Sequence, residues 1–316
     1  MSSPVWPRAT PLAAPVVVEC QAAGRADSVF LLDPAEPLLA GHYPGFPILP
    51  GVCLVECAHR TALAAVGDPT AELREIESTR FIGPVLPGDT VRTEVLAEAV
   101  EGGWRCRAQV FAERPGVSGR QKAAVVRLRY GSAADADAGG SDAGLGGPAL
   151  PAPGRGALDT AGVKRLLPHR FPMLLVDSVL TAVLGESVVA LKTVTVNEPC
   201  YAGLGEDSAD HGYPPTLLVE SWCQAAALLV CLDAPNPDVL TGQVALFGGI
   251  SGLRFGAPVR PGSQLVHRAW PVKLLDNAAV LSGAAEVAGR TVLEVDAVTI
   301  AFREAGALRA AAATGS

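Results

Sequence analysis

The chain has 316 residues, of which 49% are hydrophobic and 18% charged, and its net charge at pH 7 is −7. This length favours two domains, each able to bury its own core, and the apolar content excludes disorder as the overall state. With 25 Lys+Arg against 32 Asp+Glu, the chain lacks the basic character of a nucleic-acid-binding protein. No run approaches the roughly 18 apolar residues of a membrane helix, and Met1 to Pro15 lacks the apolar region of a signal peptide.

Seven cysteines are scattered along the chain, without a CxxC pair or a cluster with histidine. This pattern is typical of reduced thiols, so we expect a cytoplasmic protein without a zinc site. The sequence also has no Gly-rich phosphate loop, nucleotide fingerprint or metal-ligand spacing. We therefore expect no cofactor and no metal.

Predicted elements fall into two similar halves. Apolar spacing after Pro50 predicts a largely buried helix, entered through a proline, and strand-like runs follow over 90–97, 104–112 and 122–129. Residues 131–156 are Gly, Ala, Ser, Asp and Pro without apolar periodicity, which indicates a flexible linker. The second half has a helix after Pro214, then strand-like runs over 264–275, 278–287 and 291–302.

Two motifs recur in the same order, once in each half. PGVCLVE at 50–56 corresponds to PPTLLVE at 214–220, and RFIGPVLPGD at 80–89 corresponds to RFGAPVRPGS at 254–263. An internal repeat of this kind indicates two copies of one unit. We predict an α+β architecture: an N-terminal domain over 15–130 and a C-terminal domain over 157–304, each with an antiparallel sheet around one long helix.

Longer strings carry a resemblance to a known family. GHYPGFPILPGV at 41–52, followed by Glu56, closely resembles the active-site segment of bacterial 3-hydroxyacyl-acyl-carrier-protein dehydratases, which are hotdog-fold enzymes. The second half resembles the same family through LLPHRFPMLLVD at 166–177, NEP at 197–199 and ESWCQAA at 220–226. The resemblance implies a double hotdog, in which the two domains pack as the two subunits of the simpler homodimeric enzymes do. In that family the histidine of one subunit faces the carboxylate of the other's central helix.

Removal of water from a 3-hydroxyacyl thioester needs a base for the α-proton and an acid for the departing hydroxyl. A histidine and a carboxylic acid held in an apolar environment can supply both, because burial raises the pKa of a carboxyl group. The resemblance assigns His42 of the N-terminal domain as the base and Glu220 of the C-terminal domain as the acid. Gln224 lies one helical turn after Glu220, on the same face, and is expected to support it.

The thioester oxygen needs backbone donors, which the N-terminus of a central helix can supply together with its dipole. Gly51 has a free N–H and is the preferred donor. Its counterpart Pro215 has none, so a donor from the second helix would have to be Thr216.

The second composite site is predicted to be degenerate. It would pair Glu56 and Arg60 with a loop that lacks a matching histidine, and the family usually has Gln where Arg60 stands. Counting back fourteen residues from Glu220 reaches Glu206, and counting from the NEP string puts the histidine position at Leu204. We therefore expect one working site per chain.

The remaining histidines are expected to be structural. His169 and Arg170 belong to the LPHR string, interpreted as a turn between a helix and a strand. His59 on the first helix and His267 on a strand are expected to be core residues, and His211 to lie in a solvated loop, although it could replace the missing histidine.

These observations predict a cytoplasmic lyase that converts 3-hydroxyacyl thioesters to 2-enoyl thioesters in fatty acid or polyketide biosynthesis. Its substrate would be carried on the phosphopantetheine of an acyl carrier protein, with synthase partners and a further homodimer left open and no nucleic acid or membrane partner. Three alternatives remain open: a dehydratase that also isomerises its product, a hotdog thioesterase, and a non-catalytic acyl-binding partner of a synthase.

Overall fold

A computed structural model describes residues 8–131, 152–206, 208 and 210–306. Its strands form one twelve-stranded sheet in the order β1-β2-β4-β5-β6-β3-β9-β12-β11-β10-β8-β7. The first six strands are β1 (Val17–Ala22), β2 (Arg25–Leu31), β3 (Glu72–Phe81), β4 (Thr90–Val100), β5 (Gly103–Glu113) and β6 (Gln121–Gly131). The other six are β7 (Ser178–Val183), β8 (Ser187–Thr193), β9 (Gln243–Phe255), β10 (Gln264–Leu275), β11 (Ala278–Val287) and β12 (Arg290–Glu304).

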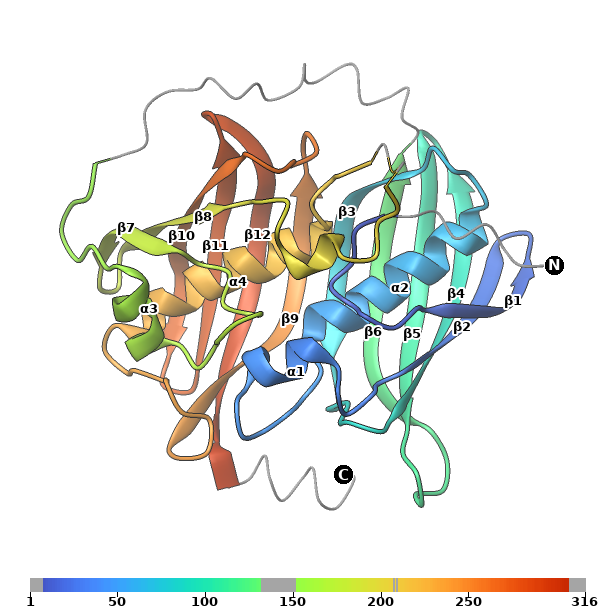
Figure 1. The fold of residues 1–316 in the computed structure, drawn as a ribbon, viewed down its shortest axis with the longest axis horizontal. Coiled ribbons are helices and arrows are strands. Elements are labelled where there is room, and N and C mark those ends of the chain that lie inside the picture. Colours follow the sequence, from blue (N-terminus) through green and yellow to red (C-terminus); the bar gives the residue numbers. More distant parts are fainter. Residues whose placement is uncertain (1–7, 132–151, 207, 209, 307–316) are drawn as a thin grey trace.

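Helices lie on one face of this sheet (Figure 1). They are α1 (Pro37–His42), α2 (Gly51–Val66), α3 (Thr160–Leu166) and α4 (Pro215–Cys231), with a 3-10 helix η2 (Pro199–Tyr201). The two long helices are the predicted ones: α2 packs on β2, β4 and β5, and α4 packs on β8 and β10. Along strand β11, buried residues alternate with partly exposed ones. This alternation is expected where one face of a sheet is covered.

The ends of the long helices follow from local sequence. Each begins directly after a proline, Pro50 or Pro214, which does not need an N–H at the first helical turn. Helix α2 ends at Val66, and the next residue, Gly67, has a left-handed φ of 69° and donates its N–H to the carbonyl of Leu63. Almost every residue of α4 is buried, which explains its nearly uninterrupted apolar sequence.

The two halves share one continuous sheet because β3 pairs antiparallel with β9, for example Ile76 opposite Leu253. The helices α2 and α4 also contact one another. The predicted α+β double hotdog is confirmed. The repeated Arg-Phe pairs end the two central strands, since β3 stops at Phe81 and β9 at Phe255.

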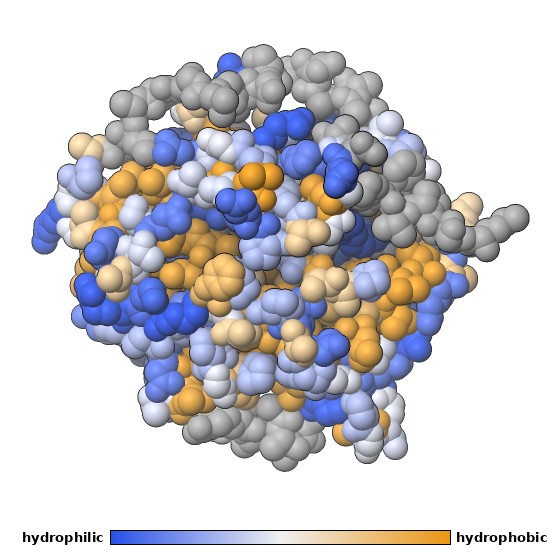
Figure 2. Space-filling model, in the orientation of Figure 1, coloured by the Kyte–Doolittle hydropathy of each residue, from blue (hydrophilic) through white to orange (hydrophobic). Residues whose placement is uncertain are grey.

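The predicted strands of each half are present as β4–β6 and β10–β12. The domain boundaries stay a prediction, because most of the expected linker (132–151) lies outside the described residues. Within the described ranges, no helix is long and apolar enough to cross a membrane. The space-filling view of the helix-bearing face shows hydrophobic residues over both halves, interspersed with polar ones (Figure 2).

Candidate active site

His42 is the last residue of α1 and is 9% exposed. Its Nδ1 lies 3.1 Å from the carbonyl oxygen of Ile48, and its ring stacks on Tyr43 with centroids 4.2 Å apart. A carbonyl oxygen only accepts, so Nδ1 carries the proton and Nε2 keeps its lone pair in the neutral ring. Burial lowers the pKa of His42 to about 4. At neutral pH this imidazole is therefore uncharged and able to accept a proton.

Glu220 lies on α4 and is 4% exposed. Gln224, one turn later, donates from Nε2 to Glu220 Oε1 at 2.9 Å. The Gln224 amide is itself fixed, because it donates to the carbonyl of Met173 at 2.7 Å and accepts from the N–H of Leu175 at 2.9 Å. Burial raises the pKa of Glu220 to about 7, and the bond from Gln224 opposes this only in part. Glu220 can therefore hold a proton near neutral pH.

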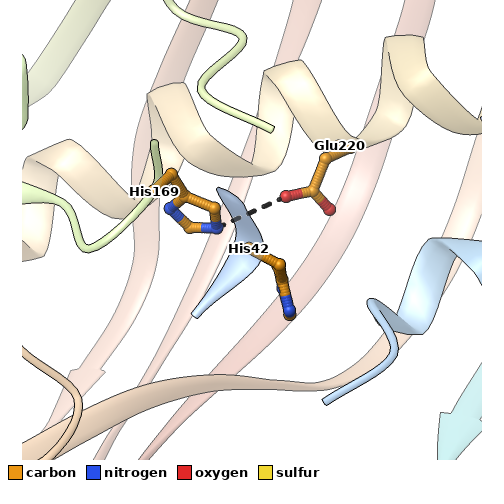
Figure 3. A group of neighbouring side chains, drawn as sticks. All are labelled: His42, His169 and Glu220. Carbon is orange, nitrogen blue, oxygen red and sulfur yellow. Dashed lines mark ion pairs between the residues drawn. The ribbon is translucent and has the colours of Figure 1, made fainter. Parts of the chain in front are cut away.

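The structure brings His42 and Glu220 together from the two halves, with a third residue beside them. The nearest nitrogen and oxygen atoms of His42, His169 and Glu220 all lie within 4.8 Å of one another (Figure 3). His169 Nε2 is 3.6 Å from Glu220 Oε1, and the imidazole points toward the carboxyl group. His169 lies between α3 and β7, as expected for the LPHR turn, and its ring in addition faces the carboxyl group of Glu220.

The LPHR segment reaches this place because it crosses from α3 to β7 past the end of α1. The N–H of Arg170 donates to the carbonyl of Gly41 at 2.7 Å, which joins the two halves directly beside His42. A Cβ on Gly41 would lie 2.4 Å from the Arg170 oxygen and 2.7 Å from the carbonyl carbon of Phe171. Glycine is needed here because both neighbours are backbone.

Two imidazoles and a carboxylate are also donors that zinc can use. Their nearest nitrogen and oxygen atoms lie within 4.8 Å of one another, with 3.6 Å between His169 and Glu220. The hydrogen bonds of His42 and Gln224 instead suit a pair of acid and base groups. The prediction that no metal or cofactor is used stays a prediction.

At the second composite position, Glu56 is 1% exposed and forms an ion pair with Arg60, Nε to Oε1 at 2.8 Å. Thr216 donates its hydroxyl to the other carboxylate oxygen at 2.8 Å. Burial alone would raise the pKa of Glu56, but the charge of Arg60, with these hydrogen bonds, outweighs it and lowers the pKa. A cavity of about 380 Å³ remains beside Glu56 and Arg60. A carboxylate held in its charged form is a poor proton donor.

The helix N-termini differ in a way that bears on the expected backbone donors. Gly51 is the first residue of α2, where N–H groups have no partner within the helix. A Cβ on Gly51 would meet the ring of Phe81 at 2.9 Å. Thr216 donates its hydroxyl to Glu56, so the N-terminus of α4 lies beside the second composite position. This arrangement favours Gly51 as the donor beside His42.

The other histidines lie apart from this group. His59 Nδ1 bonds the hydroxyl of Tyr130 at 2.8 Å, and His267 Nε2 bonds that of Ser221 at 3.0 Å, both in the buried interior. His211 lies in the loop before α4, with its ring centroid 6.4 Å from that of Tyr201.

Comparison with known families gives one match in each half. Residues 19–117 match the ApeI-like family, described as ApeI dehydratase, and residues 167–296 match the FabA-like domain. The chain is 37% identical over 160 residues to a 3-hydroxyacyl-[acyl-carrier-protein] dehydratase FabZ of Granulibacter bethesdensis, covering 50% of this chain and 91% of the relative. The FabZ of Nitrosospira multiformis is 39% identical over 140 residues, covering 44% and 93%. A relative of full length thus corresponds to about half of this chain.

Solved structures resemble the whole chain. The dehydratase domain of PpsC from Mycobacterium tuberculosis has a TM-score of 0.61 at 15% identity and covers 94% of this chain and all of its own. A fusion DH domain has a TM-score of 0.58 at 20% identity, covering 96% and 97%. At these identities the likeness shows the shared double-hotdog fold.

Proposed function

We propose, from the premise that this chain belongs to the 3-hydroxyacyl-[acyl-carrier-protein] dehydratase family, that one composite site per chain carries the reaction, with His42 as base and Glu220 as acid. Like its family, this chain dehydrates 3-hydroxyacyl thioesters in fatty acid or polyketide biosynthesis. The observation that supports the site is the approach of His42 and Glu220, from different halves, to within 4.8 Å.

In the proposed mechanism, Nε2 of His42 takes a proton from C2 of the substrate. The electron pair of that C–H bond becomes the C2–C3 double bond as the C3–oxygen bond breaks. Glu220 gives its proton to the departing oxygen, which leaves as water. His42 is then protonated and Glu220 ionised, and return of the proton from His42 to Glu220 restores the site. General acid and base groups of this kind contribute about 10²–10⁴-fold each.

The N–H of Gly51 is the proposed donor to the thioester oxygen. As C2 loses its proton, negative charge develops on that oxygen, and the N-terminus of α2 presents both an N–H and the positive end of the helix dipole. The second position would not catalyse the reaction, because Glu56 is held ionised by Arg60 and the helix α4 begins with Pro215, which has no N–H.

The substrate is proposed to arrive on an acyl carrier protein, as the names of the relatives imply for those proteins. Synthase partners and a further homodimer are compatible with this proposal. All seven cysteines are free thiols, which favours a reducing, cytoplasmic location.

The test is mass spectrometry of the purified full chain with 3-hydroxyacyl-carrier-protein thioesters of several chain lengths. Loss of one water from the acyl-carrier species is expected with the wild type and not with His42→Ala. Release of free acid would identify a thioesterase instead. A cis-3 enoyl product has the same mass as the trans-2 product, so chromatography of the released acyl groups against standards of both isomers would identify a dehydratase that also isomerises. Binding of the thioester without any mass change would indicate an acyl-binding partner.

A further inference from the structure

His169 is a buried residue that the dehydration mechanism does not use. Among the described residues, its Nδ1 has no hydrogen-bond partner, and its Nε2 is 3.6 Å from Glu220 Oε1, beyond ordinary hydrogen-bond distance. The other three buried histidines, His42, His59 and His267, each have one hydrogen bond. A buried polar group without a partner costs folding free energy, so its presence calls for an explanation.

The backbone around His169 is held firmly. Arg170 donates its side-chain Nη1 to the carbonyls of His169 and Leu167, and its N–H to the carbonyl of Gly41. The imidazole and the ring of Tyr43 are packed edge to face, with centroids 5.7 Å apart. The ring is therefore aimed at Glu220 by contacts from both halves, although it makes no hydrogen bond there.

The Gln224 amide decides which oxygen of Glu220 carries the proton. Its orientation is fixed, since its oxygen accepts from Leu175 and its nitrogen donates to Met173. The same nitrogen donates to Glu220 Oε1. Oε1 is thus the accepting oxygen, and the proton of the neutral acid sits on Oε2. His169 Nε2 faces Oε1 as well, so in the neutral ring Nε2 is the nitrogen that carries hydrogen.

We propose that His169 is a positioning residue that acts through Glu220. Its Nε2 faces Oε1, the oxygen to which Gln224 already donates, while the transferable proton lies on Oε2. As Glu220 gives up that proton, negative charge develops on the carboxylate and the contact from Nε2 shortens to a hydrogen bond. The interaction is stronger after proton transfer than before it, which is the condition for accelerating the step. This inference rests on the proposed acid role of Glu220.

The groups that face Glu220 determine how its pKa changes when the His169 donor is removed. The titratable neighbours come from four elements and are uncharged at neutral pH: His42, Tyr43, His169, Cys53 and Cys223. Within the part of the chain that the structure describes, no ammonium or guanidinium compensates the carboxylate of Glu220 in the way that Arg60 compensates Glu56. A donor to the ionised form favours that form, so loss of the His169 donor raises the pKa of Glu220.

The informative variant is His169→Phe, which keeps a ring against Tyr43 and removes both nitrogens. We expect kcat to fall about 10- to 100-fold. This is somewhat less than the loss found when a donor that already hydrogen-bonds the reacting group is removed. Because the acid must be protonated, activity is lost as pH rises through the pKa of Glu220. The alkaline limb of the kcat profile is expected to move up by about one pH unit. His169→Gln, which retains a donor, should recover part of both effects.

A second measurement does not need turnover. Infrared titration follows the protonated carboxyl of Glu220, identified by the loss of its band in Glu220→Gln, in the full chain without substrate. The band should persist to higher pH in His169→Phe than in the wild type. The matched control is His59→Phe, a buried histidine at the degenerate position, which should leave band and profile unchanged.

An inactive wild type would refute the proposed function, while the infrared titration would still decide the role of His169. Two results would overturn that role. One is a kcat of His169→Phe within about two-fold of the wild type. The other is an equal loss in His169→Phe and His169→Gln with both the alkaline limb and the infrared titration unmoved, which would indicate a purely structural residue.

Discussion

The chain contains its own control for the effect of Arg60 on a buried carboxylate. Glu56 and Glu220 occupy corresponding positions on α2 and α4, and the residue four positions later is Arg60 in one case and Gln224 in the other. With arginine the pKa of the carboxyl is lowered, whereas with glutamine burial raises it to about 7. Arg60→Gln should therefore convert the environment of Glu56 into one like that of Glu220.

The expected magnitude follows from this comparison. A carboxyl with a pKa of 4.5 in the unfolded chain and about 7 in the folded one differs by about 2.5 pKa units. At 1.36 kcal/mol per unit, this is a loss of about 3 kcal/mol of unfolding free energy above the folded pKa. The figure agrees in size with the about 3–5 kcal/mol found when one partner of a buried ion pair is removed.

The sign of the pH dependence is opposite in the two proteins. In the wild type the folded pKa of Glu56 is lowered, so its contribution is present above the unfolded pKa of 4.5 and lost as pH falls through the folded value. In Arg60→Gln the folded state would bind the proton more tightly than the unfolded state, so stability falls as pH rises from about 4.5 to about 7. The pH-dependent loss in Arg60→Gln should shrink from about 3 kcal/mol near pH 8 to about 1 kcal/mol near pH 5, and the pH-independent loss of the other Arg60 bonds adds to both values.

Urea unfolding at these two pH values, followed by circular dichroism, measures the effect. The double variant Glu56→Gln with Arg60→Gln removes both charges and should lose the pH-dependent part. A destabilisation of Arg60→Gln that is equal at both pH values would refute the reasoning, because loss of the Arg60 bonds to the carbonyls of Arg8 and Ala9 does not depend on pH.

Two further predictions concern the first site. The wild-type profile of kcat/KM should rise with pH near 4, as His42 loses its proton, and fall near 7, as Glu220 loses its own; a flat profile across neutral pH would contradict these assignments. Gly41→Ala should lower kcat by about ten-fold or more, because its Cβ would push against the backbone of the segment that carries His169. Gly203→Ala, whose Cβ would have nothing within 4 Å, is the matched control and should be silent in the same steady-state assay.

The sequence was sufficient to predict the two long helices and the strands after the repeated turns, because these depend on apolar spacing within one half. The pairing of His42 with Glu220 was implied by the resemblance to the dehydratase family, and the structure places the two side chains close together. Strands β3 and β9 were not predicted, although they join the halves. The exposure of residues along β3 and β9 departs from simple alternation. Each strand is paired on both edges, and its register shifts along its length, β3 relative to β6 and β9 relative to β12.

The role of His169 could not be derived from local sequence. It follows a short helix in a segment rich in proline, where a turn is the ordinary interpretation, and it is 51 residues from Glu220 along the chain. The packing of that segment against Gly41 of the other half, together with the bonds of Gln224 to Met173 and Leu175, brings its ring to the carboxyl group. The available signal in the sequence was Gln224 itself, because a buried amide one turn from Glu220 must find partners nearby.

The central claim is that one active site is assembled from both halves, with the acid on α4. It is tested most directly by comparing Glu220→Gln with Glu56→Gln, two isosteric changes at corresponding positions, in the carrier-protein dehydration assay. Glu220→Gln should lower kcat by at least about 10²-fold while the fold is retained, and Glu56→Gln should keep nearly full activity. An inactive Glu56→Gln beside an active Glu220→Gln would contradict the assignment of the catalytic acid.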